Sequence, residues 1–514
     1  MRLVAACGIL SILCACSGGG GGGGGPPAPA PSTATTTVSG LSPFDPGCGG
    51  AGGTLYLNAE VEPHLAVDPR DANHLVGVWQ QDRWSNGSSR GDVTGVSFDG
   101  GLTWTLSQAP FSNCTGGNAT NGGDYLRATD PWVAFAPDGT VHQISLSTSG
   151  GEFAAGSANA VLASRSADGG RTWSNPVTLL RDGASGFNDK ETLSADPTDA
   201  RFVYAVWDRI TRGAGGPSWF ARTTDGGASW EPARVIYDPG PSAQTIANLI
   251  RVLPDGTLVD MYLWLRGDAA VTDARVEVIR STDRGVTWSQ PITISAFRAM
   301  GARDPVTGQV IRDGSIVPQM AVAPNGTLYV VWQDARFSGT RDAIALSRST
   351  DGGLTWSAPV SVNGSLAVAA FTPQVHVRAD GVVGVTYFDL RSDTGDPATL
   401  LVDYWLARSS DGVTWSETRV SPAFDIATAP VVDGAFFLGD YMGLASAGDA
   451  FLAFYARTTG NALNRTDVFM TRVSATATAS KVTPEPRLAF AGDAEVERRS
   501  LDHLAREKSR RLSR

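Results

Sequence analysis

The chain has 514 residues, of which 42% are hydrophobic and 18% charged, with 60 glycines and 14 tryptophans. This composition is typical of a soluble all-β protein with many tight turns, and the length allows several ordinary domains or one large repeat architecture. The formal net charge of -10 would repel a phosphate backbone, so we expect no nucleic-acid partner. The histidines are scattered and no His or Cys cluster has zinc-ligand spacing, so we expect no metal and no cofactor.

Residues 1–16 have the organisation of a secretion signal, in which Arg2 precedes an apolar run too short for a permanent transmembrane helix. The sequence LCAC that ends at Cys16 resembles the bacterial lipobox. This resemblance implies cleavage before Cys16, lipidation of its thiol and retention at a membrane surface, and Ser17 does not suggest inner-membrane retention. We therefore expect an extracytoplasmic protein, lipid-anchored in the cell envelope at the outer membrane or cell surface. The alternative is ordinary secretion, with Cys16 removed or free.

Residues 17–46 consist of an unbroken glycine tract and a stretch rich in Pro, Ala, Ser and Thr. This composition cannot build a core, so it predicts a flexible linker between the lipid surface and a folded domain at residues 47–482. That domain contains two cysteines, Cys48 and Cys114. In an oxidising compartment they could form a disulfide that ties the N-terminal segment to the first repeat, or they could remain separate thiols.

A motif of the form Ser/Thr-x-Asp-x-Gly-x-Thr/Ser-Trp returns along the chain. In a hairpin its Asp would accept hydrogen bonds from the turn backbone, its Gly would supply a positive φ angle, and its Trp would bury a large ring. We therefore interpret these aspartates as structural and not catalytic. Five full copies end at Trp104, Trp173, Trp230, Trp288 and Trp356, and a sixth, one residue shorter, ends at Trp415.

An apolar strand, a turn and a second apolar strand precede each copy of the motif, which gives a four-stranded unit of about 60 residues. Repetition of such a unit predicts an all-β fold, a β-propeller of four-stranded blades. Seven units begin along the chain but only six carry the motif, and we favour seven blades over six. The last unit lacks a fourth strand, which residues 54–61 could supply to close the ring. The charged segment 483–514 could form a solvated helix, but a fraying tail is what we expect.

In each hairpin the start of the first strand lies beside the end of the second, so these positions should line one face of the propeller. This mouth could bind an anionic or hydroxylated ligand, and a glycan is the class we expect. An acid and an arginine recur together at these positions, so salt bridges between blades explain the recurring pairs equally well. The first-strand starts carry Glu62, Asp130, Asp189, Glu191, Asp440 and Tyr441, and the second-strand ends carry Asp82, Arg83, Asp208, Arg209, Arg266, Asp334, Arg336, Asp389, Arg391 and Arg457.

The repeated motif, known as the Asp box, and the propeller organisation resemble the sialidase (neuraminidase) superfamily over roughly residues 55–473. The resemblance implies exo-hydrolysis of terminal sialic acids by a tyrosine nucleophile, with an assisting glutamate, an aspartate acid/base and three arginines that hold the substrate carboxylate. Tyr441, at the start of the last unit, is similar to the nucleophile, and Arg266 is similar to one of the arginines. Asp82 or Asp92 could stand for the acid/base.

Part of this catalytic set is absent. Valine precedes Glu62 where the family has its first arginine, and Ala247 stands where the supporting glutamate should be. Glu191 could act as a general base in its place, with Asp130 beside it. Arginines from other blades could replace the missing ones. The candidate substrate-binding residues are Arg83, Arg266, Arg336, Arg391 and Arg457, and Arg127 is expected near the same face.

Two functions therefore remain open. The first is a sialidase-like glycoside hydrolase with a modified site, which predicts release of product. The second is a non-catalytic glycan-binding or adhesion propeller, which predicts saturable binding without product. A scaffold that binds partners through the sides of the propeller is a third reading. In each case we expect a monomer that contacts the membrane only through its lipid anchor.

Overall fold

The computed structural model describes residues 33–211, 215–267, 270–482 and 493–511. The predicted signal peptide, the lipidated Cys16 and the glycine tract lie outside these described residues. Strands make up most of the regular structure in the described part. No helix in these four stretches is both long and apolar enough to cross a bilayer.

Most strands come in consecutive antiparallel groups of four, as the repeats predict. The first group is β2 (Leu55–Asp68), β3 (Asp71–Trp84), β4 (Ser89–Ser97) and β5 (Thr105–Ser107), and the second is β6 (Arg127–Phe135), β7 (Val141–Ser149), β8 (Ala158–Ser166) and β9 (Val177–Asp182). The third is β10 (Gly186–Ala195), β11 (Val203–Thr211), β12 (Ser218–Thr223) and β13 (Arg234–Tyr237), and the fourth is β14 (Ala243–Val252), β15 (Leu258–Arg266), β16 (Asp273–Ser281) and β17 (Ile292–Ala296). The fifth is β19 (Gln319–Val322), β20 (Leu328–Asp334), β21 (Ala343–Ser349) and β22 (Val360–Ser361), and the sixth is β23 (Ala370–Val377), β24 (Val383–Asp389), β25 (Leu401–Ser409) and β26 (Ser416–Arg419).

The last repeat contains three strands, and short elements complete the fold. The three strands are β30 (Gly443–Ala447), β31 (Ala450–Asn461) and β32 (Asn464–Val473). The short strands are β18 (Ile311–Arg312), β27 (Phe424–Asp425), β28 (Val431–Val432), β29 (Ala435–Phe437) and β33 (Ser480–Lys481), and the 3-10 turns are η1 (Asn113–Thr115), η2 (Ala335–Phe337) and η3 (Ile426–Thr428).

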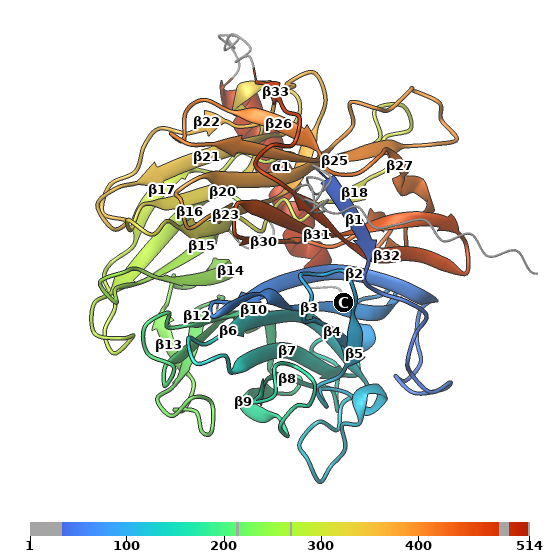
Figure 1. Cartoon of the computed structure of the whole chain (residues 1–514), viewed down its shortest axis with the longest axis vertical. Coiled ribbons are helices and arrows are strands. Elements are labelled where there is room, and N and C mark those ends of the chain that lie inside the picture. The colour runs from blue at the N-terminus through green and yellow to red at the C-terminus, as the bar shows by residue number, and fades with distance from the viewer. Residues whose placement is uncertain (1–32, 212–214, 268–269, 483–492, 512–514) are drawn as a thin grey trace, which may run out of the picture. The chain divides into compact units, whose positions relative to one another are not determined.

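The all-β, propeller-like arrangement is as predicted, but the blade count is not. The hydrogen bonds among the described strands make five sheets of four or more strands and one sheet of three, so neither seven nor six separate blades is correct. The first, second and last repeats share one 12-stranded sheet, because Ser89 pairs with Ala128 and Ala59 pairs with Thr466. Figure 1 shows the groups following one another around a common centre in chain order, from blue to red.

The three strands of the last repeat are completed by β1 (Thr33–Thr37), whereas residues 54–61, which we expected there, contribute the single pair Ala59 with Thr466. β1 pairs antiparallel with β32, from Thr33 opposite Val473 to Thr37 opposite Phe469. Threonine is β-branched and favours the extended conformation, so this run of threonines suits an outer strand. Because β1 falls inside the stretch 17–46 that we expected to be a linker, the folded part begins before residue 47.

The Asp boxes close the hairpins between the third and fourth strands. In the first copy, Asp99 accepts hydrogen bonds from the backbone N–H groups of Leu102 (3.0 Å) and Thr103 (2.9 Å) and from the Thr103 hydroxyl (2.6 Å). These hydrogen bonds stabilise the carboxylate and lower the pKa of Asp99 to about 2. The same bonds recur around Asp168, Asp225, Asp283 and Asp351. Both carboxylate oxygens accept hydrogen bonds from within the turn, which supports a structural role.

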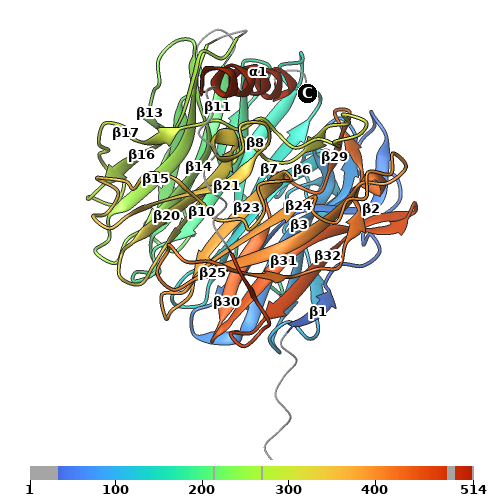
Figure 2. The same ribbon diagram turned by 90° about the horizontal axis from the view of Figure 1, so that it is seen from above.

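The C-terminal segment is a packed helix and not the fraying tail we expected. Helix α1 (Asp493–Arg511) buries Leu504 completely, in the same apolar cluster as Tyr441 and Val317. The His503 Nε2 atom lies 2.8 Å from the Ser315 hydroxyl. Figure 2 shows α1 at one end of the sheets and β1 near the opposite end. Leu504 and the partly buried Leu501 therefore pack α1 onto the propeller.

A disulfide joins Cys48 to Cys114, with 5.3 Å between their Cα atoms. The segment before β2 is also held by the Arg90 side chain, whose Nε donates to the Cys48 carbonyl at 3.2 Å. Gly49 N–H donates to the Asn113 side chain at 3.2 Å. The N-terminal segment is therefore fixed against the loop that follows β5.

Candidate functional site

The first strands of five groups carry a β-bulge near their start. In each of them two residues oppose one on the second strand, and the first of the two has a left-handed φ angle near +50° to +57°. A left-handed conformation is unfavourable for these side chains, so the surrounding ladder must hold it. The bulge turns its residue out of the regular alternation and toward the mouth. The residues are Glu62, Asp130, Lys190, Ala247 and Thr372.

Sequence analysis placed two of these five residues, Glu62 and Asp130, at the mouth but missed the bulge and the role of Lys190. The available signal was the repeated dipeptide of a polar residue and proline, which begins at Glu62, Asp130 and Thr372. A proline at the second bulge position lacks the N–H that the ladder would otherwise require. Repetition of this dipeptide at one place in the repeat could have indicated an interrupted ladder.

Two bulge residues, Glu62 and Asp130, and Asp440 before β30 surround the buried Lys190 with three carboxylates. The Lys190 Nζ atom lies 2.7 Å from Asp440, 3.0 Å from Asp130 and 3.6 Å from Glu62. All four side chains are at least nine-tenths buried. Burial raises the pKa of Glu62 to about 8, while Lys190 acts in the opposite direction. The prediction that the mouth is rich in carboxylates is thus fulfilled at its centre by a compact ion cluster.

A second cation of this cluster, Arg312, was not predicted. Its Nε and Nη2 atoms donate to the two carboxylate oxygens of Asp440 at 3.0 and 2.6 Å. Its guanidinium also lies over the Phe437 ring, 4.3 Å from the centroid. Arg312 belongs to β18, in the long connection between β17 and β19, and this connection has no counterpart in the other repeats. No periodic position therefore pointed to it.

An open pocket of about 180 Å³ lies beside this cluster. Its walls come from the first three strand groups, from β18 and from the disulfide-linked segment at Gly50 and Ala51. Charged residues of both signs face it, so it offers guanidinium donors and carboxylate acceptors within one small volume. The charged lining residues are Arg83, Arg127, Arg312, Asp130, Glu152 and Asp189.

The Arg127 side chain of the pocket makes its hydrogen bonds to neutral groups. Its guanidinium donates to the Asn86 side chain and to the carbonyls of Gly87, Ala51 and Gly52, at 2.9 to 3.3 Å. Within the described stretches of the chain it forms no ion pair, and burial lowers its pKa to about 10. It remains a cation at neutral pH, so the pocket holds a positive charge that no neighbouring carboxylate balances.

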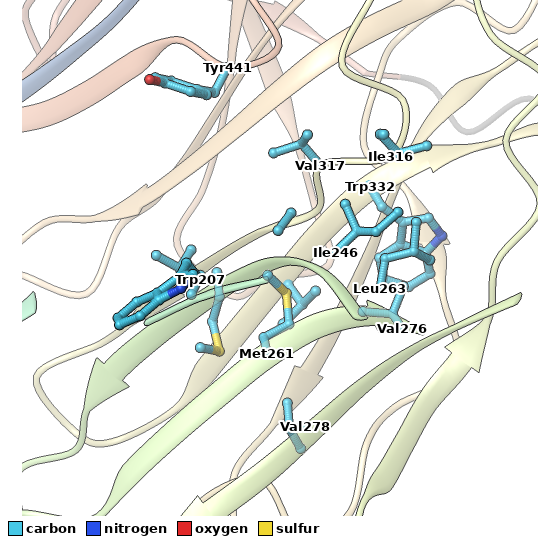
Figure 3. Close-up of a cluster of buried hydrophobic side chains, with 14 of the residues drawn as sticks. Trp207, Ile246, Met261, Leu263, Val276, Val278, Ile316, Val317, Trp332 and Tyr441 are labelled. Carbon is cyan, nitrogen blue, oxygen red and sulfur yellow. The ribbon is translucent and has the colours of Figure 1, made fainter. Parts of the chain in front are cut away.

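Tyr441 lies deeper and does not line the open pocket. Its hydroxyl donates to the Pro131 carbonyl at 3.0 Å, and its ring packs edge-on against Trp132, 5.4 Å between centroids. Figure 3 shows Tyr441 at the margin of the apolar cluster, with its hydroxyl directed away from Trp332 and Leu263. Burial raises the pKa of Tyr441 well above its ordinary value, so the phenol is neutral.

Tyr441 and Glu191 share an enclosed cavity of about 20 Å³, room for about one water molecule. Glu191 is fully buried, and within the described residues neither oxygen of its carboxyl group has a hydrogen-bond partner. Burial raises the pKa of Glu191 well above its usual range, because the charged carboxylate loses its solvation. Asp130 lines both this cavity and the open pocket and is the link between them.

The two candidates for the acid/base residue are both buried outside the pocket. Asp82 accepts from the Ser42 hydroxyl at 2.6 Å and pairs with Arg90 at 3.0 Å, so it anchors the N-terminal segment. Asp92 accepts from the Ser145 hydroxyl at 2.6 Å, and burial raises its pKa to about 8. Neither side chain reaches the pocket in this conformation.

Of the five predicted substrate-binding arginines, only Arg83 lines the pocket. Arg336 pairs with Asp334 at 2.7 Å, and Arg391 pairs with Asp389 at 2.6 Å, so these two repeat pairs are salt bridges within their own repeat. Arg457 lies over the Phe469 ring, and Arg266 is exposed at the end of β15. The recurrence of acid and arginine at these positions therefore reflects the scaffold.

Comparison with known proteins gives distant similarities. No family model matches the chain. A xyloglucanase of Paenibacillus sp is 26% identical over 279 residues, which is 49% of this chain but 23% of that enzyme. This chain thus spans less than a quarter of that relative's length.

Solved structures that match the chain include a sialidase and an arabinanase. The Hadza microbial sialidase Hz136 is 16% identical with a TM-score of 0.43, covering 80% of this chain and 73% of that chain. The α-L-arabinanase of Penicillium chrysogenum is 13% identical with a TM-score of 0.46, covering 85% of this chain and 98% of that chain.

Proposed function

We propose that the protein binds the terminal residue of an acidic glycan in the open pocket. The observation that carries this proposal is Arg127, a cation without a carboxylate partner in the described part of the chain. A sugar carboxylate would supply the counter-charge, while Asp189 and Glu152 can accept hydrogen bonds from sugar hydroxyls. At about 180 Å³ the pocket is smaller than those that enclose drug-sized ligands, so it suits one sugar residue.

Titration calorimetry with glucuronic acid and N-acetylneuraminic acid, beside neutral glucose and galactose, tests this binding. The acidic sugars should bind, and Arg127→Gln should weaken their binding by about 10-fold or more, because a charge-assisted hydrogen bond contributes roughly 1.5–3 kcal/mol. Arg457→Gln is the matched control and should leave affinity unchanged. Equal affinity for neutral and acidic sugars, or unchanged affinity in Arg127→Gln, would rule the proposal out.

Hydrolysis of the bound glycan is a second candidate, favoured by Asp130, which separates the open pocket from the buried acid Glu191. A sialidase-type reaction would require the Tyr441 hydroxyl to leave the Pro131 carbonyl and reach the pocket. The same sugars as fluorogenic glycosides, given to the protein and to Tyr441→Phe, separate the cases. Product lost in Tyr441→Phe supports the tyrosine mechanism, and product retained excludes it. If neither protein releases product, only the binding function remains.

We also propose that Cys16 is lipidated and holds the propeller at the outer face of a bacterial membrane. The motif at Cys16 and the glycine tract after it support this proposal, because a spacer is useful only where the folded part must stand clear of a surface. The protein should be recovered in the membrane fraction, and Cys16→Ala should move it to the soluble fraction. A membrane-bound Cys16→Ala variant would disprove anchoring through this residue.

A further inference from the structure

One residue of each first strand lies at an equivalent position beyond the bulges. In the five bulged strands it is the fourth residue after the bulge residue, and in β19 and β30 it is the last but one of the ladder with the second strand. Most of these residues are small. The set is Ala66, Ala134, Ser194, Arg251, Ala321, His376 and Ser446. Arg251, on β14, is the long cationic side chain among alanines and serines, so it extends into space that its neighbours leave free.

Side chains of this layer contact the first strand of the following group. The Ser194 hydroxyl donates to the Ile250 carbonyl at 2.6 Å, and the Arg251 Nε donates to the Met320 carbonyl at 2.9 Å. His376 Nε2 lies 2.9 Å from the Ser446 hydroxyl. The layer therefore encircles the centre of the propeller at the end opposite the mouth, and Arg251 lies within it.

Arg251 has no acidic partner. Its remaining contacts are the Ser194 hydroxyl at 3.4 Å and the Ile250 carbonyl at 3.2 Å, and no carboxylate of the described residues pairs with it. Burial lowers its pKa to about 10, a value at which the guanidinium is still charged at pH 7. The cations of the mouth cluster, Lys190 and Arg312, each contact a carboxylate. A half-buried cation without a counter-charge is costly unless an ion from solvent balances it.

The groups around Arg251 are neutral hydrogen-bonding groups. Burial and the nearby Arg251 charge lower the pKa of His376 to about 4 and that of His64 well below its ordinary value, so both rings are uncharged at pH 7. The Nδ1 atom of His64 is buried and has no hydrogen-bond partner among the described residues. One cation with neutral imidazoles and hydroxyls around it matches an anion of single charge.

We propose that this end of the propeller binds one small monovalent anion, of the halide class, on the Arg251 guanidinium. Five of the seven residues of the layer are small, and the His64 Nδ1 atom, which has no hydrogen-bond partner among the described residues, is available as a further donor. The ion would join the third, fourth and fifth strand groups through Arg251, which already contacts Ser194 on β10 and Met320 before β20. This site is separate from the glycan pocket and does not depend on it.

Bromide is the probe. Thermal unfolding of the full protein is measured while sodium gluconate, whose anion is too bulky for the layer, is replaced by sodium bromide at constant ionic strength. The melting temperature should rise by roughly 2 °C or more, because a ligand that binds only the folded state stabilises it. Crystals grown in bromide should give an anomalous peak within contact distance of the Arg251 guanidinium.

The variants Arg251→Met and Arg251→Lys complete the test. Arg251→Met should lose the bromide dependence and the anomalous peak, whereas Arg251→Lys should keep both in weaker form. Arg472→Gln, an arginine on β32 at the periphery, should respond as the unchanged protein does. If Arg251→Met fails to fold, the anomalous peak in wild-type crystals and the bromide dependence of Arg251→Lys still test the proposal. A wild-type protein without bromide dependence or without a peak at Arg251, or dependence retained in Arg251→Met, overturns the proposal.

Discussion

Replacing Lys190 with methionine should lower the free energy of unfolding by about 3–5 kcal/mol. The lysine lies within 3.6 Å of Glu62, Asp130 and Asp440, all of them buried, so methionine would leave these carboxylates without their shared counter-charge. Urea unfolding at pH 8 measures the loss. Lys481→Met, at an exposed lysine, is the control and should leave the unfolding curve unchanged.

The loss in Lys190→Met should be larger at pH 8 than at pH 5. Burial raises the folded-state pKa of Glu62 above its unfolded value, so this carboxyl favours folding at low pH and disfavours it as the pH rises toward 8. Without Lys190 the folded-state pKa of Glu62 rises further. The difference in stability between the wild type and Lys190→Met is therefore larger at high pH. A Lys190→Met protein as stable as the wild type at pH 8 would mean that Arg312 alone balances the cluster.

Removing the disulfide with the double substitution Cys48→Ser and Cys114→Ser should cost about 4 kcal/mol in the chain-entropy model. The two cysteines are separated by 66 residues, so the bond closes a long loop in the unfolded chain. The Gly50 and Ala51 wall of the pocket should also loosen, with a loss of glycan affinity.

Urea unfolding of the double variant without reductant, beside wild type in dithiothreitol, measures the effect of the disulfide. The double variant and the reduced wild type should lose the same free energy of unfolding relative to the oxidised wild type. A loss below about 1 kcal/mol would mean that the hydrogen bonds of Arg90 and Asn113 hold the N-terminal segment without the disulfide.

The repeats made the strand groups predictable from the sequence. Each Asp box marks a turn with a fixed chemistry, so the strands on either side of Asp99 or Asp168 follow from local residues alone. The same locality explains the correct interpretation of these aspartates as structural. Features that repeat along the chain can be recognised by comparing one unit with the next.

Features that occur once could not be predicted in this way. The completing strand β1 lies in a stretch whose composition is that of a linker, and its strand character depends on pairing with β32, more than 400 residues away. The union of three repeats in one sheet rests on single pairs such as Ala59 with Thr466. Helix α1 has a highly charged sequence, and only its contact with Val317 and Ser315 makes Leu504 and His503 core residues.

The candidate site was predicted in part. Asp130, Glu191 and Tyr441 do lie together at the centre, because the first-strand starts converge there in any propeller. Of the predicted arginines only Arg83 lines the pocket, since residues at strand ends such as Arg336 and Arg391 pair with the nearest acid of their own repeat. Arg312 and Glu152 come from connections that differ between repeats, and no periodic pattern could indicate them.

The bulges allow the side chains of the mouth to change without a change in strand register, although Glu62, Asp130 and Lys190 are coupled to one another through the ion cluster. Each bulge residue lies outside the regular ladder, which resumes on both sides of it, so a substitution there leaves the strand register intact. The five positions already differ widely, from glutamate at 62 to alanine at 247. In an evolving lineage, single-codon changes at these positions would alter ligand preference one group at a time, while selection on the Asp boxes preserves the frame that presents them.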